Sequence, residues 1–150
     1  MGTWGYRIFE DDASCDWYDE FCLQGQNFDE IEESIEDVID IEDVLEHDLC
    51  CATLVGAEII CAAYGKPSED FPDEEYHQGD DNEDALPALD FEKVRFNTTE
   101  EYTEKAIKAV KKIKKYSKSK LRQLWEEADD FNKWEACLED LMQRLSQLKV

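Results

Sequence analysis

The sequence predicts an all-α fold, a compact bundle of five to six helices. Apolar residues recur every three or four positions along most of the chain, a nearly continuous apolar stretch covers residues 49–64, and Gly and Pro separate the periodic segments. With 150 residues, 42% of them hydrophobic, the chain is long enough to form one helical domain, residues 1–150, with its own core. The apolar stretch should be a buried central helix rich in Ala, Cys and Ile.

The first helix should begin at Asp11 or Asp12, because a carboxylate is a favourable N-cap. It should run to about Gln24, since Gly25 is a typical residue just past a helix end. The residues expected to face the core are Ala13, Trp17 and Phe21.

Two further helices are predicted before residue 65. The second follows a turn at residues 25–27 and is strongly amphipathic, with Asp and Glu filling most positions between its apolar residues Phe28, Ile31, Ile35, Val38 and Ile39. The third, residues 43–64, has almost no polar stripe and should lie at the centre of the fold. Gly65 and Pro67 end it.

Residues 68–90 predict one long acidic surface loop, because Pro72, Pro87 and an acid-rich run at 77–84 interrupt any helical pattern. A short turn of helix at residues 72–77 is expected within it. Thr98 or Thr99 then caps a helix with lysines on its outer side, and a short helix follows at residues 121–128. The last helix, starting at residue 129 or 130, carries an apolar seam of Phe131, Trp134, Leu138, Leu141, Leu145 and Leu148.

Charge is divided between two parts of the chain. Residues 1–92 hold 29 acidic and two basic residues, a net −27, whereas residues 93–150 hold ten acidic and 14 basic residues, a net +4. A total of −23 opposes direct binding to nucleic acid or to anionic membranes and favours a basic partner. The lysine-rich helix is interpreted as a solvated face lying beside acidic helices.

No cofactor or metal is expected. The six cysteines form no Cys-x-x-Cys pair and fit apolar helical patterns, so they are interpreted as reduced core residues of a cytoplasmic protein. We interpret the spacing of His47 and His77 from the cysteines as unsuited to metal ligands, which opposes a zinc site. A calcium loop starting at Asp80 would need Gly at Ala85 and Glu at Phe91, and it has neither. No segment is long and apolar enough to span a bilayer.

Glu58 is the most unusual residue, an acid inside the apolar third helix. A buried carboxylate must be hydrogen-bonded or paired, and we expect the amides near residues 2–5 to bind it and so to hold the N-terminal segment in place. The full set of residues expected to have structural roles is Trp4, Gly5, Phe9, Asp12, Trp17, Glu58, Trp125 and Trp134.

The opening residues, Met-Gly-Thr-Trp-Gly-Tyr-Arg-Ile-Phe-Glu-Asp-Asp-Ala-Ser-Cys-Asp-Trp, carry a family resemblance. They resemble an uncharacterised bacterial domain family whose members begin Met-Gly-Ala-Trp-Gly and continue to a Phe, an Asp/Asn pair and an Ala. Ala57-Glu58, the Gly65-Lys66-Pro67 end of the helix, and the segments 121–127 and 134–145 are similar too. The resemblance implies a small helical fold and a domain of unknown function, and it supplies no reaction.

The leading functional hypothesis is a stoichiometric binding protein, of inhibitor or immunity type, rather than an enzyme. Acids at three- and four-residue spacing on a helix lie about 5–6 Å apart and match rows of Lys and Arg on a partner such as a nuclease toxin. The free protein should be a monomer. The expected partner-binding residues are Asp73, Glu74, Glu75, Asp80, Asp81, Glu83 and Asp84 in the loop, and Glu32, Glu33, Glu36 and Asp40 on the second helix.

Two alternatives stay open. One is a phage-type DNA mimic that inhibits restriction or CRISPR-like enzymes. The other is an enzyme or small-ligand protein that uses Glu58, which would require a concave pocket around that residue.

Overall fold

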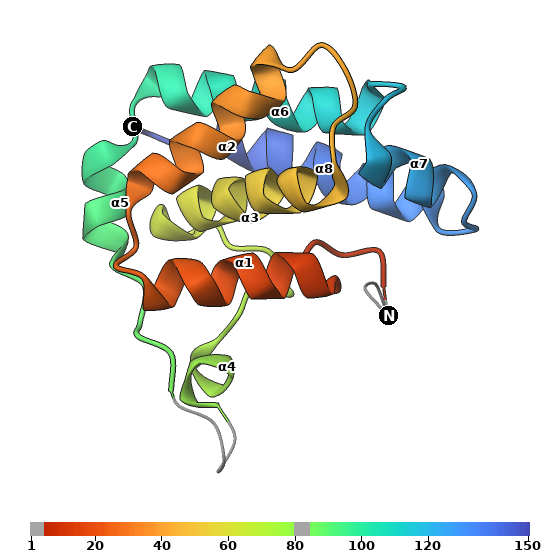
Figure 1. The fold of residues 1–150 in the computed structure, drawn as a ribbon. Helices are drawn as coiled ribbons and strands as arrows, with labels where there is room; N and C mark the ends of the chain where they lie inside the picture. The colour runs from red at the N-terminus through yellow and green to blue at the C-terminus, as the bar shows by residue number, and fades with distance from the viewer. Residues whose placement is uncertain (1–4, 80–84) are drawn as a thin grey trace.

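The computed structural model describes residues 5–79 and 85–150. Within them the chain forms eight α-helices and no strand (Figure 1). Their bounds are α1 Asp12–Leu23, α2 Phe28–Asp40, α3 His47–Ala63, α4 Glu74–Gln78, α5 Phe91–Asn97, α6 Glu100–Lys115, α7 Lys120–Glu126 and α8 Phe131–Ser146. The all-α prediction is confirmed, while the expected count of five to six helices was too low.

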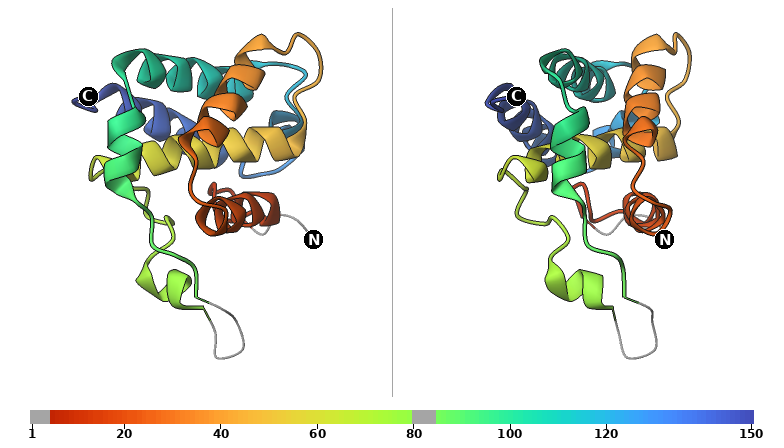
Figure 2. Two further views of the ribbon diagram at one scale, coloured as in Figure 1. Left: turned by 60° about the vertical axis from the view of Figure 1, so that its left-hand side comes forward. Right: turned by 90° about the vertical axis from the view of Figure 1, so that its left-hand side faces the viewer.

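Helix α3 is the centre of the fold, as its apolar sequence predicts. Every residue from Cys50 to Ala63 is buried, and α1, α2, α5, α6, α7 and α8 all pack against it. Figures 1 and 2 show α3 running through the middle, with α1 on one side and α2, α6 and α8 on the other. The helix ends at Ala63, and Gly65, just past the C-cap Tyr64, has a φ of +79°, which glycine adopts at little cost.

Helix α1 is capped as expected but rotated. Asp11 is the N-cap, and its side chain accepts a hydrogen bond from the amide of Ala13. The buried residues of α1 are Ser14, Tyr18, Phe21 and Cys22. The expected stripe was therefore right only at Phe21, because Ala13 and Trp17 are half-buried at the edge of the core.

The second half adds one helix that the sequence reading missed. Helix α5 lies between the loop and α6, where Asp90 caps its N-terminus and Val94 is its buried residue. Thr99 caps α6, as expected, by accepting from the amide of Tyr102. The segments that precede α3 and α7 are joined by an isolated parallel β-bridge between Leu45 and Ser119.

The segment of residues 68–90, which we call the arm, carries α4. Figures 1 and 2 show α4 set apart from the other helices, on the far side of α1 from α3. The arm folds back on itself, because the amide of Leu86 donates to the carbonyl of His77 at 2.7 Å. The expected long loop thus contains a short helix, as predicted, and has a fixed base.

No helix in the described ranges, 5–79 and 85–150, has the length and hydropathy needed to cross a membrane.

Candidate functional site

The acidic face of α2 is divided between solvent and α6. Glu33 and Asp40 are exposed, whereas Glu32 and Glu36 are half-buried. Glu36 accepts hydrogen bonds from the Tyr102 hydroxyl at 3.3 Å and from Lys105 Nζ at 3.4 Å. Part of the predicted binding row is therefore occupied by internal contacts.

Three of the six lysines of α6, Lys105, Lys112 and Lys114, make contacts inside the fold, and the other three are exposed. Lys112 Nζ donates to the carbonyl of Ile39 at 3.1 Å and also to that of Ile41, so it closes the C-terminal end of α2. Lys114 is buried and pairs with Glu139 of α8. The interpretation of these lysines as a face beside acidic helices fits these contacts, although Lys114 is not on a solvated face.

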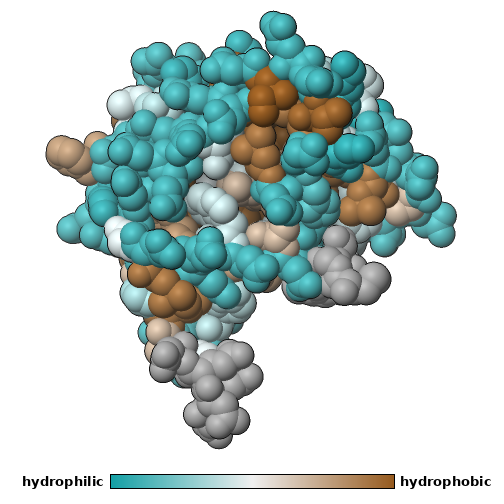
Figure 3. All heavy atoms as spheres, in the orientation of Figure 1, coloured by the Kyte–Doolittle hydropathy of each residue, from teal (hydrophilic) through white to brown (hydrophobic). Residues whose placement is uncertain are grey.

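The arm presents the other predicted acids. Asp73 caps α4 by accepting from the amide of Tyr76 at 2.9 Å, and Asp73, Glu74 and Glu75 are all exposed. Asp80, Asp81, Glu83 and Asp84 lie outside the described residues. Over the face shown in Figure 3 the surface is largely hydrophilic, with separate smaller hydrophobic patches.

An aromatic cluster fixes the arm to α1. The ring of Phe71 packs edge-on against Phe9 and Tyr18, with ring centroids 5.4 and 5.9 Å away. His77 Nδ1 donates to the carbonyl of Pro87, so its Nε2 accepts from the Tyr18 hydroxyl. Burial raises the pKa of Tyr18, which keeps this hydroxyl a donor. The arm is therefore a docked element.

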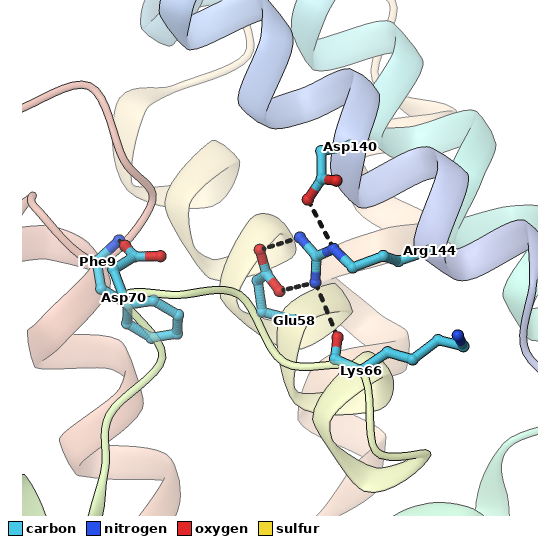
Figure 4. A network of polar contacts seen from close by, with 6 residues as sticks. All are labelled: Phe9, Glu58, Lys66, Asp70, Asp140 and Arg144. Carbon is cyan, nitrogen blue, oxygen red and sulfur yellow. Dashed lines mark hydrogen bonds and ion pairs between the residues drawn. The ribbon is translucent and has the colours of Figure 1, made fainter.

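Glu58 is bound by a cation on α8, whereas backbone amides of the N-terminal segment were expected. Arg144 of α8 donates to both of its carboxylate oxygens, at 2.6 and 2.9 Å (Figure 4). The same guanidinium donates to Asp140 and to the carbonyl of Lys66. Among the described residues the partner of Glu58 is therefore this guanidinium, and the expected amides of residues 2–4 lie outside the described ranges.

Asp70 has the tethering role that we had assigned to Glu58. Its carboxylate accepts from the amide of Phe9 at 3.0 Å, which holds the segment before α1 against the arm (Figure 4). Glu58 itself is 1% exposed, and burial raises its pKa while Arg144 opposes that rise.

A cleft of about 520 Å³ adjoins this ion pair. Both partners line it, together with Arg7, Ser68 and Lys133 among others. Within the described ranges, the Ser68 hydroxyl is buried without a hydrogen-bond partner. A concave space beside Glu58 is the condition set for the small-ligand alternative, and the structure meets it.

The remaining residues with predicted structural roles are distributed as follows. Trp134 and Phe9 are buried, and Trp125 is at the edge of the core, 9% exposed. Trp17 stacks on Phe21 at the surface of α1. Asp12 is exposed, because the capping role belongs to Asp11.

Trp4 lies outside the described residues. Gly5 approaches Glu10 so closely that an added Cβ would lie 2.5 Å from its carboxylate.

One histidine does lie at ligand spacing from a cysteine, contrary to the prediction. His47 and Cys51 are four residues apart on α3, and this spacing places them on one face of the helix. Asp11 joins them, since one ligand atom from each of the three residues lies within 4.8 Å of the other two.

Comparison with known proteins adds a family. The model described as "Domain of unknown function (DUF4259)" matches residues 2–137. No curated protein and no solved structure matches the chain.

Proposed function

Because the chain belongs to the DUF4259 family, which has no function to transfer, we propose from its own charges that it binds one basic protein partner stoichiometrically. It acts as an inhibitor or immunity-type protein, without catalysis, and covers a cationic surface such as that of a nuclease toxin. In this proposal the free protein is a monomer in the cytoplasm, and its six unpaired cysteines support a reducing compartment.

The observation that carries the proposal is that, in the described part of the chain, the basic residues of α6 are partly neutralised inside the fold, whereas the exposed carboxylates of α4 are not. The basic helix α6 uses Lys105, Lys112 and Lys114 in contacts with α2 and α8. Within residues 5–79 and 85–150 the exposed carboxylates of α4 form no ion pair with a base, and they stand on a helix that lies apart from the other helices (Figure 1). Part of the excess negative charge of the chain is therefore exposed where a partner has access.

A docked arm suits this role. Since Phe71 and His77 hold it against α1, Asp73, Glu74 and Glu75 are positioned before the partner arrives. Binding then costs less conformational entropy than ordering a free loop would. Acids on a fixed scaffold also favour fast association at low salt that weakens as salt rises.

Charge reversal tests the proposal. The arm variant carries Lys at Asp73, Glu74 and Glu75, and a second variant carries Lys at Glu33 and Asp40 of α2. A matched control carries Lys at three exposed acids of the basic half, Glu104, Glu127 and Asp129. Tagged proteins are used to capture partners from the native host at low salt, followed by a salt gradient.

We expect the arm variant to lose capture of a stoichiometric partner while the control retains it, with all three proteins folded by circular dichroism. Capture that persists unchanged in both acidic-face variants contradicts the proposal. Elution by duplex DNA of several different DNA-binding enzymes supports the DNA-mimic alternative instead.

The cleft beside Glu58 favours a second candidate, a small-ligand protein. Both oxygens of Glu58 are bound by Arg144, so a ligand would meet Ser68, Arg7 and Lys133 at the cleft surface rather than a free carboxylate. Ala136 lines the cleft and is exposed, so Ala136→Trp should fill it without disturbing the core.

A thermal-shift screen of small anionic and zwitterionic metabolites tests this candidate. A compound that raises the Tm of the parent protein but not of Ala136→Trp supports it. A screen in which no compound distinguishes the two proteins removes it.

A further inference from the structure

Three different metal-ligating side chains meet at the junction of α1 and α3. A carboxylate oxygen of Asp11, a ring nitrogen of His47 and the Sγ of Cys51 all lie within 4.8 Å of one another. In tetrahedral zinc sites, ligand bonds of 2.0–2.3 Å separate neighbouring donor atoms by roughly 3.3–3.7 Å. Shifts of a few tenths of an ångström to about 1 Å therefore suffice to surround an ion.

The backbone holds the three donors in place. His47 and Cys51 are successive residues on one face of α3, at the i, i+4 spacing by which a helix presents two ligands to one metal. Asp11 is the N-cap of α1, and its Oδ1 is fixed by the amide of Ala13 at 3.0 Å. This bond directs Oδ2 toward His47 Nε2, 2.8 Å away.

Two of the three donor residues are buried, and the third is accessible from solvent. Asp11 and Cys51 are only 4% and 2% exposed, whereas His47 is half-buried at the surface. A pocket of about 440 Å³ opens beside the histidine, lined by Asp11 and His47 and by the carboxylates of Asp12, Asp16, Glu20 and Asp48. Such a mouth concentrates dications and leaves room for water as a fourth ligand.

From this arrangement we propose that Asp11, His47 and Cys51 form a binding site for a divalent transition metal of the Zn²⁺ class. A nitrogen, a sulfur and an oxygen donor match Zn²⁺ and Co²⁺, whereas Ca²⁺ and Mg²⁺ prefer oxygen ligands alone. The site is independent of the partner-binding function proposed for α2 and the arm.

The binding step balances through the release of protons. The Cys51 thiol gives its proton to solvent and binds as thiolate. When the His47 ring is neutral, the proton on Nε2 is replaced by the metal and reappears on Nδ1, so one proton leaves in total. When the ring is an imidazolium, Nε2 loses its proton to solvent as well, so two protons leave.

Cobalt(II) is the probe, because a thiolate bound to Co²⁺ gives a charge-transfer absorption band and tetrahedral Co²⁺ has intense visible bands. The full-length protein, reduced and treated with chelator, is titrated with Co²⁺ and then with Zn²⁺, which should displace Co²⁺ and abolish the bands. Titration with Ca²⁺ measures how much binding the acidic mouth provides by itself.

The variants separate the site from the other cysteines. Cys51→Ala and His47→Gln each remove one donor, and His47→Gln changes a surface residue that can still hydrogen-bond to Asp11. Cys50→Ala is the matched control, since Cys50 is the adjacent, equally buried cysteine and contacts Ser119 instead.

We expect Cys50→Ala to keep the spectrum, Cys51→Ala to lose the charge-transfer band, and His47→Gln to weaken Co²⁺ binding. The loss of affinity should exceed the roughly 10–100-fold that loss of a neighbouring hydrogen-bond partner costs in metal sites. The proposal is overturned if the parent shows no thiolate band, or if folded His47→Gln binds Co²⁺ as tightly as the parent does. Charge reversal on the arm should leave the Co²⁺ spectrum unchanged.

Discussion

Replacing the half-buried Arg144 by Met should strongly destabilise the fold. The substitution keeps a long apolar side chain on α8 but removes the guanidinium that binds both oxygens of Glu58. Glu58 then remains 1% exposed with no cation in contact among the described residues. Removing one partner of a buried ion pair in this way costs about 3–5 kcal/mol.

That loss is large relative to the total. Domains of this kind are stable by about 5–15 kcal/mol, and 1 kcal/mol corresponds to about 2–4 °C in Tm for a chain of this length. We therefore expect Tm to fall by roughly 6–20 °C. Glu58→Leu combined with Arg144→Met should recover most of this, because an apolar pair of similar volume avoids the desolvation of both charges.

The cost should also depend on pH in a defined direction. Burial already raises the pKa of Glu58 above its value in the unfolded chain, and loss of Arg144 raises it further. Between the two pKa values only the unfolded state releases its proton, so the penalty grows with pH; above the folded-state pKa both states are ionised and the penalty is fully present. Below the unfolded-state pKa both states are protonated, and the penalty from this carboxyl vanishes.

Urea unfolding of the parent, Arg144→Met and the double variant from pH 4 to pH 8 measures these effects. Lys133→Met is the control on the same helix, since Lys133 is exposed and pairs with Asp130 for about 0–1 kcal/mol at most. If Arg144→Met costs no more than Lys133→Met, or if its cost does not shrink on acidification, the interpretation of Glu58 as a buried charge that depends on Arg144 is wrong.

Three smaller effects follow from other contacts. Thr99→Ala should cost about 1 kcal/mol in urea unfolding, because it removes the N-cap of α6, whereas Ser117→Ala on the surface should stay within about 0.5 kcal/mol. Tyr18→Phe should cost about 1–3 kcal/mol by leaving the ring nitrogen of His77 without its donor, and limited proteolysis should then cut the arm faster. Lys114→Met should change the free energy of unfolding by no more than about 1 kcal/mol, because the aliphatic part of the buried Lys114 side chain, and not its charge, packs in the core. Lys114→Ala should cost more, and equal costs for the two variants would contradict this.

Helical periodicity predicted most of the fold because packing follows it directly. The exceptions have specific causes. On α1 the sequence offers Trp17 and Tyr18 side by side, and hydrophobicity favours burying the former. Tyr18 can be buried instead because His77, 59 residues away, accepts a hydrogen bond from its hydroxyl. Helix α5 is too short for a periodic signal and has only Val94 to bury.

The same limit applies to the candidate sites. The sequence shows that a buried Glu58 needs a partner, but the choice among the cations depends on where α8 crosses α3. Arg144 lies 86 residues from Glu58 in the sequence, and the sequence alone does not distinguish it from the other Lys and Arg residues. The cluster of Asp11, His47 and Cys51 could have been predicted in part, because the four-residue spacing of His47 and Cys51 is visible in the sequence. The approach of Asp11 depends on how α1 packs on α3.

The Glu58 ion pair also determines where this domain can be cut. The match to the family ends at residue 137, in the first half of α8, whereas Arg144 lies a further two turns along that helix. A fragment trimmed to the matched residues would contain the carboxylate and lack its cation, together with Leu138, Leu141 and Leu145 of the core. Such a fragment should fail to fold for reasons unrelated to its activity, so expression work on this chain should retain all of α8.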